Sequence, residues 1–414
     1  MLAEIITIGD ELLLGQTIDT NSAWMGAQLA AHGIRVHRIT SISDESEAIR
    51  AALDESLLRV DFVLITGGLG PTRDDITKET LADYFDTQLV MDQAILERIT
   101  QWFAGRGFEM LDVNRHQAML PEACKVLVNP RGTAMGMWFE RDAGKKVVVS
   151  MPGVPYEMKG LMREEVLPRA DLHWALPTRY HRTLLTQGVG ESYLSELVWD
   201  WEERLESRGV SIAYLPAPGQ VRVRLSAVDA EASKAKERVE AEVADFITLA
   251  GSHVVSDQDE SLGAAVVRVL TRRKMTLATA ESCTGGAIAS SITSVPGSSA
   301  MFMGSVVAYD NRVKQEMLGV SSVSLEEHGA VSEEVVVQMA QGARKRLRTD
   351  YAVATSGVAG PSGGTEEKPV GTVWIALAGP SGVEAKCLSL GNSRDRNIER
   401  SMREALAWII RSVK

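Results

Sequence analysis

The chain has 414 residues, 45% of them hydrophobic, so its length predicts two to four domains that can each bury a core. Its formal net charge of −11 argues against broad binding of nucleic acid or anionic membranes, although local loops can still bind small phosphates. The cysteines Cys124, Cys283 and Cys387 form no Cys-x-x-Cys pair, so neither a disulfide framework nor a zinc knuckle is indicated. Without a signal-peptide pattern or a membrane-length apolar run, we expect a cytoplasmic protein with no membrane partner.

Apolar runs alternate with helix-like segments over the first 170 residues or so. Strands are predicted at 3–8, 34–41, 61–66 and 145–150, a β-hairpin at 126–140, and helices at 22–32, 44–58, 77–85, 93–104 and from 155 onward. Asp44 and Glu47 have the spacing of a capping pair for the second of these helices. This alternation is typical of a three-layer α/β domain with a parallel sheet and helices on both faces.

The most informative stretch of this region is 64–77, which reads as a strand, a glycine loop and a helix start. Glycine loops let backbone N–H groups approach phosphate oxygens, and here the glycines are Gly67, Gly68 and Gly70. Asp74 and Asp75 follow, and carboxylates beside a phosphate imply a divalent metal between them. A tight turn with an aspartate N-cap explains the same pattern without any ligand.

Other acidic residues lie where neighbouring strands end. Asp10 and Glu11 follow the first strand, and Glu157 lies in the first turn of the helix after the last strand. Because ligands bind at the carboxyl ends of parallel strands, these three residues are expected to join Asp74 and Asp75 as metal ligands at one rim. Glutamate is also favoured in the first turn of any helix, which is the structural alternative for Glu157.

Residues 175–251 differ in character and predict a small α+β unit of the order β-α-β-β-α. Its strand, helix, hairpin and second helix are expected at 182–188, 192–208, 210–227 and 231–250. The polar segment 252–260 predicts a linker to a last α/β domain at 261–414. In that domain, strands are expected at 275–280, 306–309, 350–356 and 370–378, and helices at 262–273, 287–291 and 397–413.

Ser282 lies where a strand of the last domain turns into a helix. At such a position its oxygen can be exposed at the helix N-terminus, where backbone N–H groups can stabilise an oxyanion. Alternatively, Ser282 or Thr284 only caps the helix. A serine nucleophile also needs a base, and Lys314 can serve if partial burial or nearby cations lower its pKa. The alternative for Lys314 is an ordinary solvated lysine on a helix.

Three motifs of the first domain resemble the N-terminal domain of the CinA family of competence/damage-inducible proteins. They are Gly9-Asp-Glu-Leu-Leu-Leu-Gly-Gln16, Gly67-Gly-Leu-Gly-Pro-Thr-Arg-Asp-Asp-Ile-Thr77 and Pro152-Gly-Val-Pro-Tyr-Glu157. The resemblance implies, for residues 1–172, a molybdopterin-binding-like fold that hydrolyses ADP-ribose with a divalent metal. One departure is Asp19, where the family usually has asparagine.

The middle unit resembles the KH-like domain of the same family. It has no Gly-x-x-Gly loop and its second helix is acidic, so we expect no binding of RNA. A spacer or a dimerisation module fits the sequence better, and we expect a homodimer.

The last domain resembles the C-terminal CinA domain in residues 280–286, 309–314 and 357–372. That family includes deamidases of nicotinamide mononucleotide (NMN), described as serine–lysine amidohydrolases, which implies Ser282 as nucleophile and Lys314 as base, without a cofactor. Tyr309 would assist or orient, and Ser356 would lie near the active centre. The residues implied to bind substrate are Thr284, Gly285, Gly360, Gly363, Gly364 and Arg396. Arg396 would hold the phosphate, with Arg394 as the alternative.

Together these features predict a bifunctional enzyme of pyridine-nucleotide salvage. Its C-terminal domain would convert NMN and water to nicotinate mononucleotide and ammonia. Its N-terminal domain would hydrolyse ADP-ribose to AMP and ribose 5-phosphate. The alternatives are a non-enzymatic partner of recombination factors during competence and, for the first domain, molybdopterin binding or adenylylation, since the shared fold does not fix the substrate.

Overall fold

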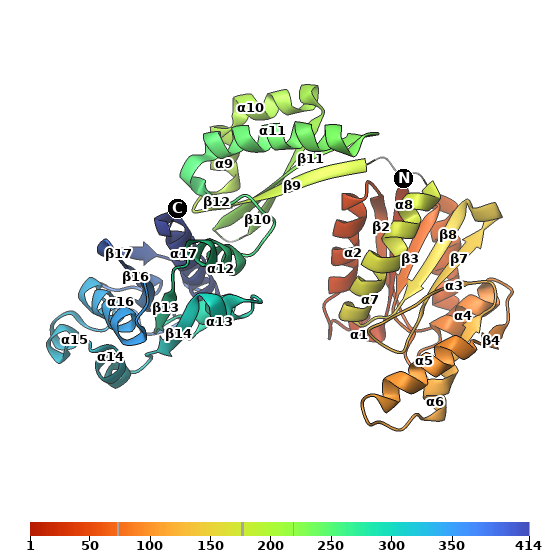
Figure 1. Ribbon diagram of the computed structural model, residues 1–414, viewed down its shortest axis with the longest axis horizontal. Coiled ribbons are helices and arrows are strands. Elements are labelled where there is room, and N and C mark those ends of the chain that lie inside the picture. Colours follow the sequence, from red (N-terminus) through yellow and green to blue (C-terminus); the bar gives the residue numbers. More distant parts are fainter. Residues whose placement is uncertain (73, 175–177, 218, 414) are drawn as a thin grey trace. The chain divides into compact units, whose positions relative to one another are not determined.

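The computed structural model describes residues 1–72, 74–174, 178–217 and 219–413 (Figure 1). The chain forms two compact units, Met1–Tyr180 with Val228–Ala235, and His181–Ala227 with Lys236–Lys414. No helix in the part of the chain that the structure describes combines the length and apolar character needed to cross a membrane.

The first unit is built on a six-stranded sheet of order β2-β1-β3-β8-β7-β6 (Figure 1). Its strands are β1 (Leu2–Ile8), β2 (Arg35–Ile42), β3 (Phe62–Thr66), β6 (Lys125–Leu127), β7 (Gly136–Arg141) and β8 (Lys146–Met151). Strands β2, β1, β3 and β8 are parallel, whereas β7 pairs antiparallel with both of its neighbours, β8 and β6. The predicted parallel sheet is therefore mixed, because the predicted hairpin joins it as two antiparallel strands.

Helices cover both faces of this sheet and bury separate cores. On one face, Met25 and Leu29 of α2 (Thr20–Ala31) pack with Met158 and Leu161 of α7 (Pro155–Leu161). The other face is covered by α3 (Ser46–Arg59), α4 (Thr77–Tyr84) and α5 (Gln93–Ala104). The remaining elements of this unit are α1 (Asp10–Leu13), β4 (Leu89–Met91), α6 (Asp112–Arg115), η1 (His116–Ala118), β5 (Met119–Pro121), η2 (Asp142–Gly144), η3 (Met162–Val166) and α8 (Leu167–Trp174). The expected three layers are confirmed.

The expected Asp44–Glu47 capping pair is wrong. The N-cap of α3 is Glu45, and its side chain makes no capping hydrogen bond. The Asp44 carboxylate instead accepts a 3.0 Å hydrogen bond from the backbone N–H of Asp10. Asp44 therefore ties the carboxyl end of β2 to the start of α1.

The second unit begins with a four-stranded sheet of order β10-β11-β9-β12. Its elements are β9 (Thr178–Gln187), α9 (Glu191–Leu197), α10 (Trp199–Leu205), η4 (Glu206–Arg208), β10 (Val210–Ala217), β11 (Gln220–Asp229), α11 (Ala232–Ala250), η5 (Gly251–His253) and β12 (Val254–Ser256). The expected β-α-β-β-α order is present. The segment expected as a linker, 252–260, instead contains β12, which pairs antiparallel with β9.

The rest of this unit is a five-stranded sheet of order β14-β13-β15-β16-β17 with helices on both faces (Figure 1). The strands are β13 (Leu277–Glu281), β14 (Phe302–Val307), β15 (Tyr351–Gly357), β16 (Thr372–Gly379) and β17 (Gly382–Ser389). The helices are α12 (Leu262–Arg273), α13 (Ala287–Thr293), η6 (Ser298–Ala300), α14 (Asn311–Leu318), α15 (Ser322–His328), α16 (Glu333–Leu347) and α17 (Arg394–Val413). Strands β14, β13 and β15 are parallel, so their carboxyl ends share one edge.

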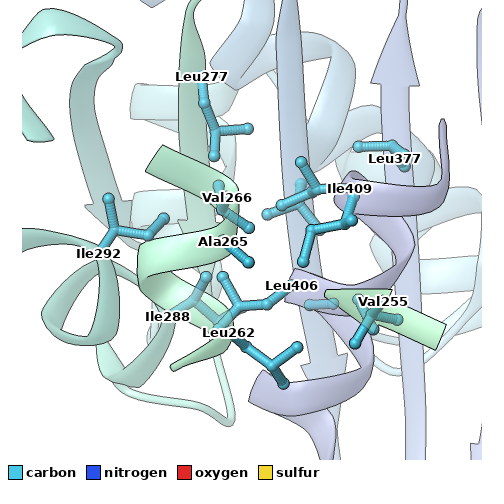
Figure 2. Packing of buried hydrophobic residues seen from close by; sticks show 14 of the residues in the cluster. Val255, Leu262, Ala265, Val266, Leu277, Ile288, Ile292, Leu377, Leu406 and Ile409 are labelled. Carbon is cyan, nitrogen blue, oxygen red and sulfur yellow. The ribbon is translucent and has the colours of Figure 1, made fainter. Parts of the chain in front are cut away.

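A single apolar cluster holds α12, α13 and α17 against this sheet. Leu406 and Ile409 of α17 face Val266 of α12 and Ile288 of α13, as Figure 2 shows. Val255 of β12 belongs to the same cluster. Arg394 and Arg396 lie in the first turn of α17, so this packing fixes the backbone positions from which their side chains extend.

We expect Leu406→Ala to lower the free energy of unfolding of the second unit by about 2 to 5 kcal/mol, because it leaves a cavity in a fully buried cluster. Urea denaturation of the full chain measures the change. The control, Val323→Ala, alters a side chain that is 55% exposed and should change the free energy by less than about 0.5 kcal/mol. Equal effects of the two substitutions would contradict the packing described.

Candidate functional sites

Ser282 lies between two strand ends in the C-terminal sheet. Its backbone N–H donates to the Thr355 carbonyl of β15 at 3.0 Å, and the Ala308 N–H after β14 donates to the Glu281 carbonyl at 2.8 Å. Ser282 is 8% exposed. The expected strand-to-helix turn is therefore present, at the shared edge of three parallel strands.

The helix after Ser282 is capped by Glu281, which sequence reasoning did not identify. The fully buried Glu281 carboxylate accepts hydrogen bonds from the backbone N–H groups of Gly286, Ile288 and Ala289 at 2.8 to 3.1 Å. The Thr284 hydroxyl also donates to it at 2.8 Å. These three amides are already bonded to Glu281 and are not free to stabilise an oxyanion, so that role stays a prediction for the backbone N–H groups of the turn before them. Neither Ser282 nor Thr284 is the cap.

Lys314 is a buried lysine. Its side chain is only 1% exposed, and its Nζ donates to the Tyr309 carbonyl at 3.1 Å. Burial lowers the pKa of Lys314 from its ordinary value of 10.5, although the nearby charge of Asp310 opposes this shift. The alternative of a solvated helix lysine is therefore wrong, and a neutral amine becomes available at a lower pH than in free lysine.

Tyr309 connects Lys314 to one of the two candidate arginines. Its ring is 61% exposed, and its hydroxyl accepts a 3.1 Å hydrogen bond from Arg394 Nη2. Arg394 Nη1 also donates to the Gly360 carbonyl at 2.9 Å. Arg396 instead lines a different pocket, together with Arg400 and Gly219. Of the two arginines, the structure brings Arg394 to this site.

The remaining predicted residues surround this centre to different extents. The Ser356 hydroxyl is buried and donates to the Ala330 carbonyl at 2.6 Å, so its proton is already engaged. Gly285 closes the turn through its N–H, which donates to the Ser282 carbonyl at 3.1 Å. Gly360 is buried in the loop that Arg394 contacts, whereas Gly363 and Gly364 lie exposed further along it.

Cys283 is not suited to act as the nucleophile. Its side chain is buried, and burial raises the pKa of the Cys283 thiol to about 12, with the Glu281 carboxylate contributing. Because the thiolate is the reactive form of cysteine, this thiol is inert near neutral pH. Ser282 is thus the more suitable nucleophile of the two neighbours.

In the first unit, a pocket of about 360 Å³ lies at the carboxyl ends of the parallel strands. Its lining includes the predicted residues Glu11, Asp74, Asp75, Glu157, Gly67, Gly68 and Gly70. Asp10 is not among its lining residues, although its backbone contacts Asp44. We call this pocket the acidic pocket.

Asp44 also lines the acidic pocket and was not identified from the sequence. Burial raises the pKa of Asp44, and the negative charges of Asp10, Glu11 and Asp75 raise it further. The signal that could have revealed it is an acidic residue just beyond a predicted strand, as for Asp10.

Glu157 and Asp75 are each held by local hydrogen bonds. Glu157 accepts from Asn129 Nδ2 at 2.5 Å and lies over Gly132, where a Cβ would overlap its carboxylate. Burial raises the pKa of Glu157, although this hydrogen bond opposes the shift. Asp75 accepts from the backbone N–H of Thr72 at 3.0 Å and also from its hydroxyl.

The donor chemistry of the acidic pocket fits a hard divalent cation, because every charged group that lines it in the described part of the chain is a carboxylate. Within the described ranges, no three His, Cys, Asp or Glu side chains are grouped to hold a metal ion by themselves. Mg²⁺ is usually bound through one or two carboxylates together with substrate phosphates and waters. The residues therefore fit a cation that binds together with a phosphate ligand.

Asp19, the departure noted in the sequence, has a structural role. Its carboxylate accepts from the backbone N–H of Ser22 at 2.9 Å and so caps α2. It also lines a smaller pocket of about 110 Å³ beside the acidic pocket, which includes Asn21. The residue is thus used as an N-cap at the rim of the site.

Three family models match the chain consecutively. They are described as "Probable molybdopterin binding domain" over residues 4–171, "Damage-inducible protein CinA KH domain" over 181–248 and "CinA C-terminal domain" over 259–413. The fold is accordingly that of a three-domain protein with a molybdopterin-binding-like domain, a KH-like domain and a CinA domain.

Two full-length relatives extend this agreement. A CinA-like protein of Flavobacterium psychrophilum is 42% identical over 100% of this chain and 99% of its own length. A CinA-like protein of Cytophaga hutchinsonii is 43% identical over 100% of this chain and 98% of its own length. A crystal structure of competence/damage inducible protein CihA from Agrobacterium tumefaciens is 40% identical, with a TM-score of 0.36, and covers 36% of this chain and 92% of that chain. The chain belongs to the CinA family.

We expect Lys314→Met to stabilise the second unit at neutral pH relative to wild type. In the unfolded chain the amine keeps its proton up to about pH 10.5, whereas the folded state releases it at lower pH. The unfolded state thus binds more protons in this interval, and the wild-type free energy of unfolding rises with pH. As the pH rises toward 10.5, the difference in free energy of unfolding between Lys314→Met and wild type should narrow. The total narrowing should be about 1.4 kcal/mol for each unit by which folding lowers the pKa of Lys314.

Urea denaturation of both proteins at several pH values between 7 and about 10 tests this expectation. Lys345→Met, which changes an exposed lysine of α16, is the matched control and should show no such pH dependence. A constant difference between Lys314→Met and wild type at every pH would show that the lysine is protonated normally in the folded state.

Proposed function

We propose that the C-terminal domain is a serine–lysine amidohydrolase that deamidates NMN to nicotinate mononucleotide. The observation that carries the proposal is the buried Lys314, whose lowered pKa favours the neutral amine that a serine nucleophile needs as its base. Two contacts at one sheet edge support this pairing: the Ala308 N–H bonds to the carbonyl of Glu281, the residue before Ser282, and Lys314 Nζ bonds to the carbonyl of Tyr309, the residue after Ala308.

In the proposed reaction, Ser282 Oγ attacks the carboxamide carbon while neutral Lys314 Nζ takes the hydroxyl proton. Lys314 then returns this proton to the leaving nitrogen, so that ammonia departs and an acyl-enzyme ester remains. In the second half, Lys314 takes a proton from water, the resulting hydroxide attacks the ester, and Ser282 recovers its proton as the acid leaves. The balance is NMN and water to nicotinate mononucleotide and ammonia, which requires no cofactor.

Arg394 is the residue that we propose for the phosphate of NMN. Its guanidinium offers several N–H donors in a planar fork that suits phosphate oxygens. Its contacts with the Tyr309 hydroxyl and the Gly360 carbonyl hold the side chain between Tyr309 and the loop that contains Gly360. Asn397 adds support, because its Nδ2 donates to the Ala359 and Gly391 carbonyls at 2.9 and 2.7 Å.

We further propose that the N-terminal domain hydrolyses ADP-ribose at the acidic pocket. A divalent cation would offset the repulsion between carboxylates and pyrophosphate and would polarise the phosphorus–oxygen bonds. Glu11, Asp74 and Asp75 are the proposed ligands, and the backbone at Gly67 and Gly68 would approach the phosphates. Asp44 and Glu157 have raised pKa values, so each is suited to exchange a proton with water in the pocket.

Two other functions compete with the proposed enzymatic activities. A non-enzymatic partner in competence would have no use for a buried lysine at this sheet edge, since burying an amine that has only one carbonyl hydrogen bond is costly. For the first domain, the matching family model names molybdopterin binding, and a pterin phosphate could use the same glycine loop. Parallel incubation of the protein with NMN and ADP-ribose, with and without divalent metal, separates the enzymatic proposals from both alternatives.

We expect Ser282→Ala and Lys314→Ala each to lower deamidation of NMN by about 1,000-fold or more, and the double variant to be little worse, because groups that act as a unit give non-additive losses. Wild-type kcat should fall as the pH drops below the lowered pKa of Lys314, since the protonated amine cannot accept the serine proton.

Ammonia release measured for the four proteins tests this prediction, with folding verified by circular dichroism. Lys345→Ala is the control for removal of a lysine and should keep full activity. Near-wild-type turnover by Ser282→Ala would show that the hydroxyl is only a structural part of the turn.

We expect Asp75→Ala to lower ADP-ribose hydrolysis by about 100-fold or more, as is usual when a metal-binding network loses a group, and to leave NMN deamidation intact. Chelation with EDTA should give the same separation, because only the first reaction needs a cation. The control Asp83→Ala changes a side chain that is 75% exposed. Loss of both activities on EDTA addition, with recovery on adding metal, would contradict the serine–lysine mechanism.

A further inference from the structure

A second pocket, of about 400 Å³, adjoins the acidic pocket. The two share Leu69, Gly70, Pro71, Asp75 and Gln117. Beyond the shared residues, the second pocket is lined by the apolar side chains of Ile76 and Val113 and by the polar or charged residues Thr72, Lys78, Glu79 and His116. It therefore contains more apolar wall and fewer carboxylates than the acidic pocket, and it suits an uncharged ring better than a metal-bound phosphate.

Gln117 is the unusual residue at the boundary of the two pockets. Its side chain is 6% exposed, yet its Oε1 is buried and has no hydrogen-bond partner among the residues that the structure describes. Buried polar groups in proteins are nearly always hydrogen-bonded, so an unpaired one requires an explanation. A side-chain amide carries an acceptor and two donors, so a ligand that presents both kinds of group can satisfy it.

The backbone on both sides of Gln117 is held in place. Lys78 Nζ donates to the His116 carbonyl at 2.7 Å, and the Asp92 N–H donates to the Ala118 carbonyl at 2.9 Å. The side chain of Lys78 is itself largely buried. The amide of Gln117 is thus presented from a fixed turn, which is what a site that reads hydrogen-bonding groups requires.

We propose that the second pocket binds an adenine ring and that Gln117 recognises its hydrogen-bonding edge. Glutamine pairs with adenine through two hydrogen bonds, one from N6–H to its oxygen and one from its amide to a ring nitrogen. Leu69, Ile76 and Val113 provide apolar surface for the ring. This inference rests on the proposed hydrolysis of ADP-ribose and adds the direction in which the substrate lies.

With adenine in the second pocket, the pyrophosphate lies in the acidic pocket. The terminal ribose then extends toward the smaller pocket lined by Thr17, Asp19 and Asn21, which adjoins the acidic pocket through Ile8, Glu11 and Gly153. Polar groups suit a sugar, and the volume of about 110 Å³ suits it better than a nucleoside. The three adjoining pockets thereby account for the three parts of the substrate.

Isothermal titration of the full chain with AMP tests the proposal without relying on catalysis. We expect Gln117→Leu to weaken binding of AMP by about tenfold or more, as for other bidentate contacts between glutamine and adenine. Gln117→Glu keeps the size and one acceptor but loses the donor, so it should give an intermediate loss and guards against misfolding of the first variant. Gln101→Leu, the same change at an exposed position of α5, should bind AMP as wild type does.

Hydrolysis of ADP-ribose gives the second readout. We expect Gln117→Leu to raise the KM for ADP-ribose while the binding of ribose 5-phosphate stays unchanged. Unaltered affinity for AMP in Gln117→Leu, or no binding of AMP by wild type, overturns the adenine site. Gln117-dependent binding of AMP without hydrolysis of ADP-ribose would support the adenine site and reject the proposed reaction. Hydrolysis of ADP-ribose with an unchanged KM in Gln117→Leu would support the proposed reaction and reject the adenine site.

Discussion

The C-terminal site depends on the hydrogen bonds that the buried carboxylate of Glu281 accepts. A charge removed from water must be satisfied by hydrogen bonds, and Glu281 obtains them from three amides at the start of α13 and from the Thr284 hydroxyl. These bonds fix the turn of residues 282–286 between the end of β13 and its helix. The position of Ser282 at the sheet edge follows from that turn and from the strand pairing on either side of it.

Hydrophobic alternation was sufficient to predict the layered first domain, because buried strands and amphipathic helices have different periods. It predicted the hairpin of β6 and β7 but could not show that this hairpin pairs with β8, which makes the sheet mixed. The Asp44–Glu47 pair failed for a related reason. Capping spacing is local, whereas the bond that Asp44 makes, to the backbone of Asp10, joins residues 34 positions apart.

At the C-terminal site, sequence spacing could identify Ser282 and Lys314 as candidates but could not show whether the lysine is buried. Its burial depends on α14 packing against the rest of the domain, which is a tertiary property. Sequence spacing could not decide between Arg394 and Arg396 either. The two residues lie in the same helical turn, and the direction in which each side chain points depends on how the helix is placed. Only the placement of α17 by its apolar face decides that Arg394 reaches Tyr309 and Gly360.

The two candidate sites treat unfavourable charge in opposite ways. In the acidic pocket, burial raises the pKa of Asp44 and the crowded carboxylates raise it further; an added cation would relieve this crowding, which is why the proposed chemistry there depends on a metal. At the C-terminal site a single buried amine lowers its own charge by releasing a proton, and nothing external is needed. Each arrangement destabilises the unliganded fold, and a chain selected only for stability would replace both with apolar residues. Stability of the fold therefore does not account for either arrangement, whereas the proposed reactions supply a use for both.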